Sequence, residues 1–267
     1  HDALPISKRP PMTDQFDDPT TAHEQKRRAL SPYLKFLRNL DPETSLETRI
    51  EHIAYDVFED GIDWLADALR ESGVSAGVSV PAIHLQDAAV RDGVSRLLDA
   101  GAEVVVHGYR HTSYMETPYE TVNEELTAIF ERFESDLDAR PAGFHIPFMR
   151  CSPEAVRAAE EHGIEWIVGA RPDVDTSITF LQPESPYDLQ LFERGHDGPA
   201  VTDRMAEAAD DGSLLLSHPN IHAVHDARES FVSFLESEPF AKPSEIAAGE
   251  TDRPGLLFDC FPPFQVR

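Results

Sequence analysis

The sequence has few cysteines and no long apolar runs, and each shortage excludes a class of protein. Its two cysteines, Cys151 and Cys260, form no Cys-x-x-Cys pair and no disulfide framework, a usage typical of a reducing compartment. There is no run of about eighteen or more apolar residues and no secretory leader, so we expect a cytoplasmic protein that does not enter a membrane. Glycine-rich phosphate-binding patterns are also absent.

Positive charge is scarce as well. The chain has 23 Lys and Arg residues against 49 Asp and Glu, which gives a net charge of −26, and its only lysines are Lys8, Lys26, Lys35 and Lys242. A field of this sign repels phosphate backbones, so we expect no nucleic-acid partner. Diffuse acidity with little lysine resembles the cytoplasmic proteins of extreme halophiles, although an acidic protein from an ordinary environment is the alternative.

The length of 267 residues fits one α/β barrel domain with a short extension. Residues 1–29 are polar, contain several prolines and have no periodicity, so we interpret them as a disordered or non-native extension. Within them, residues 1–11 resemble a translated sequencing adaptor ahead of Met12. The catalytic domain is expected over 30–267.

Strand and helix patterns alternate along that domain, which predicts parallel strands joined by right-handed crossovers. The stretch 170–199 has little periodicity and is expected to be a long loop that lines or covers a site. We expect strands at 49–55, 74–80, 103–107, 143–147, 163–168, 213–217 and 255–259, and helices at 30–40, 60–72, 88–100, 121–137, 153–162, 201–209 and 230–235.

The stretch from Val104 to His111 is the most informative part of the chain. A short buried strand runs directly into His107 and His111, which stand four residues apart. If the chain turns helical after Val106, both imidazoles face one side and could begin a zinc site, whereas the alternative is ordinary surface polarity. Asp56, His145 and His218 also occur at or near the ends of expected strands, which predicts a site at the carboxyl end of a barrel.

Three motifs then resemble the polysaccharide deacetylase (NodB-homology) family. They are His107-Gly-Tyr-Arg-His111, Gly143-Phe-His-Ile-Pro-Phe148 and Leu215-Leu-Ser-His218, in the family's order. The resemblance implies an irregular (β/α)7 barrel that removes acetyl groups from sugars with a divalent metal. The expected ion is zinc, and the expected substrate is a carbohydrate or small glycoconjugate.

The resemblance also implies a metal-binding set of Asp56, His107 and His111. The family's Thr-Phe-Asp-Asp-Gly motif is altered here, because the gapless register aligns Tyr55-Asp56 with the aspartate pair. A rival register aligns Glu59 and Asp60 instead, which makes Glu59 the general base and Asp60 the ligand. Both registers remain open at this point.

The remaining expected roles concern proton transfer and substrate binding. His218 is the expected proton donor, with Asp173 or Asp175 as its aspartate partner. The substrate-binding residues implied by the resemblance are Tyr109, His145, Pro147, Phe148 and Arg150, with His145 in place of the family's arginine.

These residues support three hypotheses. The first is a metal-dependent hydrolase acting on a non-peptide carbon–nitrogen bond or an ester. The second is a degenerate barrel that binds a ligand or metal without hydrolysis, because fold does not imply function. The third is an unrelated α/β protein with structural histidines.

Overall fold

The computed structural model describes residues 61–259 except residue 211, and the fold is an irregular, nearly closed barrel of seven parallel strands. The strand order is β5-β4-β3-β2-β1-β7-β6, and every pair is parallel. The strands are β1 (Gly77–Val80), β2 (Glu103–Val106), β3 (Gly143–Arg150), β4 (Trp166–Ala170), β5 (Thr179–Leu181), β6 (Leu214–Ser217) and β7 (Gly255–Asp259).

The two ends of the sheet approach each other just after β5. Pro183 bridges to Leu214 of β6, and the N–H of Glu184 donates to the Leu214 carbonyl at 2.8 Å. The predicted fold class is therefore confirmed.

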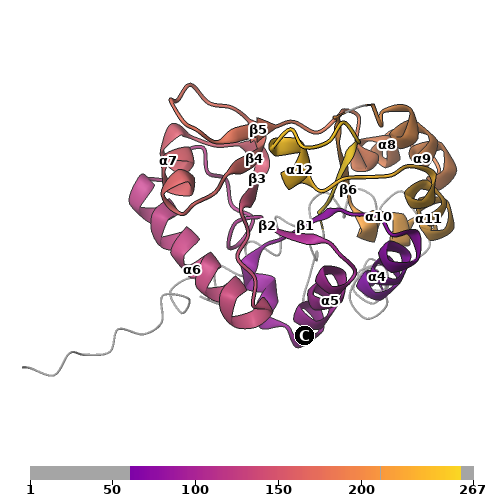
Figure 1. The fold of residues 1–267 in the computed structure, drawn as a ribbon, viewed down its shortest axis with the longest axis horizontal. Helices are drawn as coiled ribbons and strands as arrows, with labels where there is room; N and C mark the ends of the chain where they lie inside the picture. The colour runs from indigo at the N-terminus through magenta and orange to yellow at the C-terminus, as the bar shows by residue number, and fades with distance from the viewer. Residues whose placement is uncertain (1–60, 211, 260–267) are drawn as a thin grey trace, which may run out of the picture.

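Most helices lie on the outer side of the sheet, whereas α12 lies between β5 and β6 (Figure 1). Within the described part of the chain no helix has the length and apolarity to cross a membrane. The helices are α4 (Gly61–Ser72), η1 (Ala82–Gln86), α5 (Ala88–Asp99), α6 (Tyr119–Leu137), α7 (Pro153–Glu161), α8 (Asp188–Glu193), α9 (Gly198–Glu207), α10 (Pro219–Val224), α11 (Arg228–Ser237) and α12 (Pro243–Ala247).

Most of the expected elements are present near their expected bounds, but the expected loop over 170–199 is wrong. It contains β5 and α8, which have only three and six residues and so give little periodic signal. The expected helix 30–40 and strand 49–55 lie outside the described residues.

Strand β7, the last strand among the described residues, lies between β1 and β6. Its register pairs Asp259 with Ser79 of β1, and Phe258 with Ser217 of β6. This arrangement brings the last described residue of the chain to the carboxyl edge of the sheet, beside the ends of the strands that precede it.

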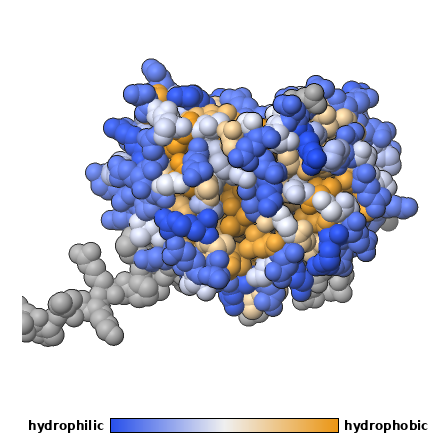
Figure 2. Space-filling view, viewed as in Figure 1, coloured by the Kyte–Doolittle hydropathy of each residue, from blue (hydrophilic) through white to orange (hydrophobic). Residues whose placement is uncertain are grey.

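Two apolar cores hold the barrel. The larger fills the space between sheet and helices, and a smaller one inside the barrel contains Val105, Trp166, Val168, Leu214, Leu216 and Leu257. Gly143 is required for this packing, because a Cβ there would lie 2.0 Å from the Trp166 ring. Figure 2 shows hydrophilic residues over the outer helices and apolar residues toward the middle of the same face.

Candidate metal and catalytic site

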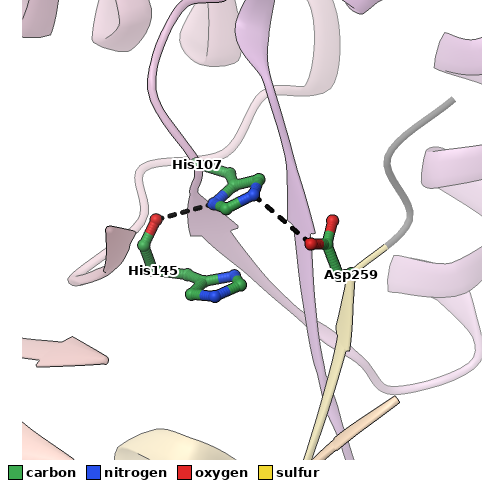
Figure 3. A group of neighbouring side chains, drawn as sticks. All are labelled: His107, His145 and Asp259. Carbon is green, nitrogen blue, oxygen red and sulfur yellow. Dashed lines mark hydrogen bonds and ion pairs between the residues drawn. The ribbon is translucent and has the colours of Figure 1, made fainter. Parts of the chain in front are cut away.

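His107, His145 and Asp259 meet at the carboxyl edge of β2, β3 and β7 (Figure 3). All three are buried, with relative exposures of 1%, 2% and 7%. One potential ligand atom from each lies within 4.8 Å of the other two, and His107 Nε2 is 3.4 Å from Asp259 Oδ2. The two imidazoles stack, with ring centroids 4.1 Å apart.

Hydrogen bonds fix how both rings are oriented. His107 Nδ1 donates to the carbonyl of His145 at 2.7 Å. Ser79 Oγ donates to the carbonyl of Phe258, and it lies 3.1 Å from His145 Nδ1. Because a hydroxyl has one proton, Ser79 is left to accept a hydrogen bond from His145 Nδ1.

The electrostatics of the cluster favour a neutral His145 ring near an ionised Asp259 carboxylate. Burial lowers the pKa of His145 well below its usual value, and His107 lowers it further. Burial would raise the pKa of Asp259, but His107 and then His218 outweigh it and hold that pKa below its usual range. The carboxylate is therefore charged in a site from which water is largely excluded.

His218 lies next to this cluster at the end of β6. Its Nε2 is 3.7 Å from Asp259 Oδ2, and its Nδ1 is 2.7 Å from Asp188 Oδ1. Burial alone would lower the pKa of His218, but Asp188 and Asp259 outweigh it and raise that pKa. His218 is thus a histidine held between two carboxylates.

Asp188 is fully buried and collects several donors. It accepts hydrogen bonds from the Ser217 hydroxyl, the His218 N–H and His222 Nε2, in addition to the His218 ring. The expectation that Asp173 or Asp175 pairs with His218 is corrected, because both are exposed and Asp188 makes the contact. Sequence reasoning missed Asp188 because it lies within the stretch interpreted as an irregular loop.

The segment from His107 to His111 is a loop, so the chain does not turn helical after Val106. Gly108 and His111 have φ of +75° and +57°, which turn the chain sharply. The His111 ring packs edge-on against His107 at 4.6 Å and against Phe148 at 4.8 Å. Burial is the main cause that lowers the pKa of His111 to about 3, and the neighbouring His107 ring lowers it as well.

A buried acid on α6 holds this loop. Glu125 accepts a hydrogen bond from the N–H of Tyr109 at 2.8 Å and another from the Tyr114 hydroxyl. Tyr109 itself is fully buried in the core between sheet and helices, where its hydroxyl accepts from Arg132. Its expected contact with substrate is therefore corrected.

Three other residues that are expected to bind substrate differ in their exposure. Phe148 is 62% exposed beside His111, and Arg150 is exposed, whereas Pro147 is buried. The expected residues Asp56 and Glu59 lie outside the described part of the chain.

The donor set fits a divalent metal. His107 Nε2 and Asp259 Oδ1 are buried and have no hydrogen-bond partner among the described residues. Two ligand atoms on a tetrahedral zinc lie about 3.4 Å apart, given bond lengths near 2.1 Å, and His107 Nε2 and Asp259 Oδ2 have that separation. Mixed imidazole and carboxylate ligands with room for further ligands are typical of catalytic zinc sites.

Comparison with known proteins gives a match to one family over part of the chain and a likeness to one fold. Residues 51–167 match the sequence profile of the polysaccharide deacetylases. No curated protein matches the chain. A candidate polysaccharide deacetylase from Mycobacterium smegmatis has a TM-score of 0.60 at 17% identity, over 85% of this chain and 86% of that one.

Two further solved structures have the same fold. A family 4 carbohydrate esterase from Streptomyces lividans, in complex with acetate, has a TM-score of 0.55 at 13% identity, over 73% of this chain and 92% of that one. A CE4 family pseudoenzyme from Bacillus anthracis has a TM-score of 0.56 at 14% identity, over 75% of this chain and 65% of that one.

Proposed function

We propose, from the premise that this chain is a divergent member of the polysaccharide deacetylase family, that it is a metal-dependent hydrolase that removes an acetyl group from a carbohydrate. The bond cleaved is a non-peptide carbon–nitrogen bond or an ester. Zinc is the proposed ion.

The observation that carries the proposal is the arrangement around Asp259. One buried carboxylate lies 3.4 Å from the Nε2 of His107 and 3.7 Å from the Nε2 of His218. His107 and Asp259 would hold the ion together with a second imidazole. When bound, a divalent ion supplies Lewis acidity, which polarises the acetyl carbonyl and makes water a stronger nucleophile.

His218 is the proposed proton donor to the leaving amine or alcohol. Asp188 binds its Nδ1, so its Nε2 is the nitrogen directed toward Asp259 and the reacting atoms. The raised pKa of His218 favours the protonated form that this role needs. Glu59 remains the proposed general base.

Substrate would enter past the exposed ring of Phe148, next to His111. The N–H of Phe148 is the proposed oxyanion donor, and Arg150 is a further proposed substrate contact. The buried side chain of Pro147 is proposed to shape the part of the site beside Phe148, where substrate would enter.

A second candidate function is binding without hydrolysis. The observation that favours it is the likeness to the Bacillus anthracis pseudoenzyme, together with the altered aspartate motif. The same fold therefore occurs in a protein described as inactive.

Turnover of acetylated sugars and small acetyl esters separates the two functions. We expect zinc-loaded wild type to release acetate, and His218→Ala to lose at least about 100-fold in kcat while it keeps its zinc, as general acid–base assistance is worth about 10²–10⁴. His196→Ala, a partly exposed histidine outside the site, serves as control. Retention of zinc without turnover in either protein would favour the binding function, and equal rates would exclude His218 as the donor.

A further inference from the structure

We infer that Glu125, on helix α6, is a positioning residue for the metal site, because it holds the loop from His107 to His111 in shape without help from the ion. This inference rests on the proposed metal dependence. It assigns a task to a buried acid that takes no part in the proposed hydrolysis, and the task is to fix the backbone that carries the two imidazoles.

The first argument concerns the backbone groups in the middle of the loop. The N–H of Ala82, at the start of η1, donates to the carbonyl of Gly108 at 3.0 Å. The next N–H, that of Ile83, donates to the carbonyl of Tyr109 at 2.9 Å. The N–H of Tyr109 in turn donates to Glu125 Oε1 at 2.8 Å. These three backbone groups are therefore satisfied by the fold itself, and Glu125 is the partner of the one donor among them.

The second argument concerns Tyr114, which shares the same acceptor. Its hydroxyl donates to Glu125 Oε1, and its fully buried ring packs edge-on against Phe144 at 5.5 Å. Gly108 lies against that hydroxyl, because a Cβ at Gly108 would be 2.9 Å from Tyr114 Oη. Glycine also suits the φ of +75° at this position. The turn that follows His107 is thus packed directly on the pair formed by Tyr114 and Glu125.

The third argument concerns the connection to β3. The carbonyl of Tyr114 accepts the N–H of Ser152, just after β3, at 3.1 Å. The ring of His111 contacts that of Phe148, near the end of the same strand, at 4.8 Å. A change at Glu125 would therefore move the loop relative to β3 as well as disturb the loop itself.

The loop needs an acceptor oxygen at this place more than it needs a negative charge. Glu125 is 6% exposed, and burial raises its pKa, while the bonds from Tyr114 and Tyr109 only partly offset this. Glutamine would keep the oxygen and remove the charge. Leucine would remove both and leave the Tyr109 N–H in the core without its acceptor.

Zinc titration of single variants, in competition with a chromophoric chelator, tests the inference. Glu125→Leu should weaken zinc binding about 10- to 100-fold, the usual effect of losing a group that orients metal ligands. Glu125→Gln should stay within about threefold of wild type, because it keeps the oxygen. Phe130→Leu is the matched control, since Phe130 is buried on the same helix but stacks on His162 at the end of α7. It should lower Tm and leave zinc affinity unchanged.

Amide hydrogen exchange in the wild type gives a readout that does not depend on how any variant folds. In zinc-free protein the Tyr109 N–H should exchange at least about 100-fold more slowly than that of Asp175, which lies in an exposed loop. A Tyr109 N–H that is protected only after zinc is added would show that the ion shapes the loop, which would overturn the inference.

Two results of the titration would also overturn it. Unchanged zinc affinity in Glu125→Leu, or an equal loss in Phe130→Leu, would mean that Glu125 has no specific effect on the site. An equal loss in Glu125→Gln and Glu125→Leu would mean that the charge acts on the ion, and not the position of the oxygen on the loop.

These outcomes are separable from those for the proposed function. Zinc binding that depends on Glu125 as expected, without acetate release, would leave the positioning role standing and remove the hydrolase. Acetate release by the wild type, with unchanged zinc affinity in Glu125→Leu, would do the reverse. A wild-type protein that binds no zinc, manganese or cobalt would overturn both.

Discussion

At the scale of single residues, the partly buried carboxyl of Glu103, away from the site, shows how burial and hydrogen bonding have opposite effects on a pKa. Glu103, at the start of β2, accepts a hydrogen bond from the N–H of Ser244 at 2.9 Å. Burial raises its pKa above the usual 4.5, and the bonds to Ser244 only partly offset this. The fold therefore binds the protonated carboxyl better than the unfolded chain does.

Replacement of Glu103 by glutamine should reveal that preference. A raised folded pKa gives stability that is present below the unfolded pKa and is lost as pH rises through the folded pKa. Glu103→Gln keeps an oxygen for Ser244 and cannot ionise, so its free energy of unfolding relative to wild type should increase from pH 4 to pH 7. Urea unfolding at both values measures this, with the exposed Glu165→Gln as control. A relative stability that falls over that range would contradict the assignment.

At the scale of elements, helix ends were well predicted from sequence because their chemistry is local. Ser152 and Pro153 predicted the start of α7, and the Ser152 hydroxyl accepts from the N–H of Ala155 at 3.2 Å. The hydroxyl thereby satisfies one of the four N–H groups that lack a partner in the first turn of the helix.

Loss of this cap should destabilise the protein measurably. Ser152→Ala should lower the free energy of unfolding by about 0.5–2 kcal/mol, the usual range for a lost N-cap. Ser135→Ala, the same change at an exposed position inside α6, should cost less because alanine is the better helix former. Denaturant unfolding of wild type, Ser152→Ala and Ser135→Ala measures both losses. Equal losses of unfolding free energy in the two variants would argue against a capping role for Ser152.

What the sequence could not predict is the spatial order of the strands. The bounds of β7 were predicted from its apolar run, yet no periodicity indicates that it inserts between β1 and β6. His107, His145 and His218 were all singled out, but Asp259 was missed because its importance comes from that insertion. Asp188 was missed for a different reason, since a helix of six residues has too few turns to show a period.

At the scale of the whole molecule, charge is the dominant feature. The net charge of −26 makes like-charge repulsion larger in the compact state than in the expanded chain. Ion pairs oppose this only weakly, because pairs such as Arg70–Asp67, Arg140–Glu134 and Arg204–Glu207 are largely exposed. Exposed pairs contribute about 0–1 kcal/mol each.

Salt should therefore stabilise this protein, although it weakens its ion pairs. Raising KCl from 0.1 M to 1 M shortens the screening length from about 10 Å to about 3 Å, which suppresses the repulsion among dispersed acids. We expect Tm to rise with salt and the gain to flatten once screening is complete. Sucrose at equal osmolality is the control, since it is excluded from protein surfaces but does not screen charge. A Tm that stays flat or falls in KCl would mean that the ion pairs outweigh the net charge, and the halophilic interpretation of the composition would fail with it.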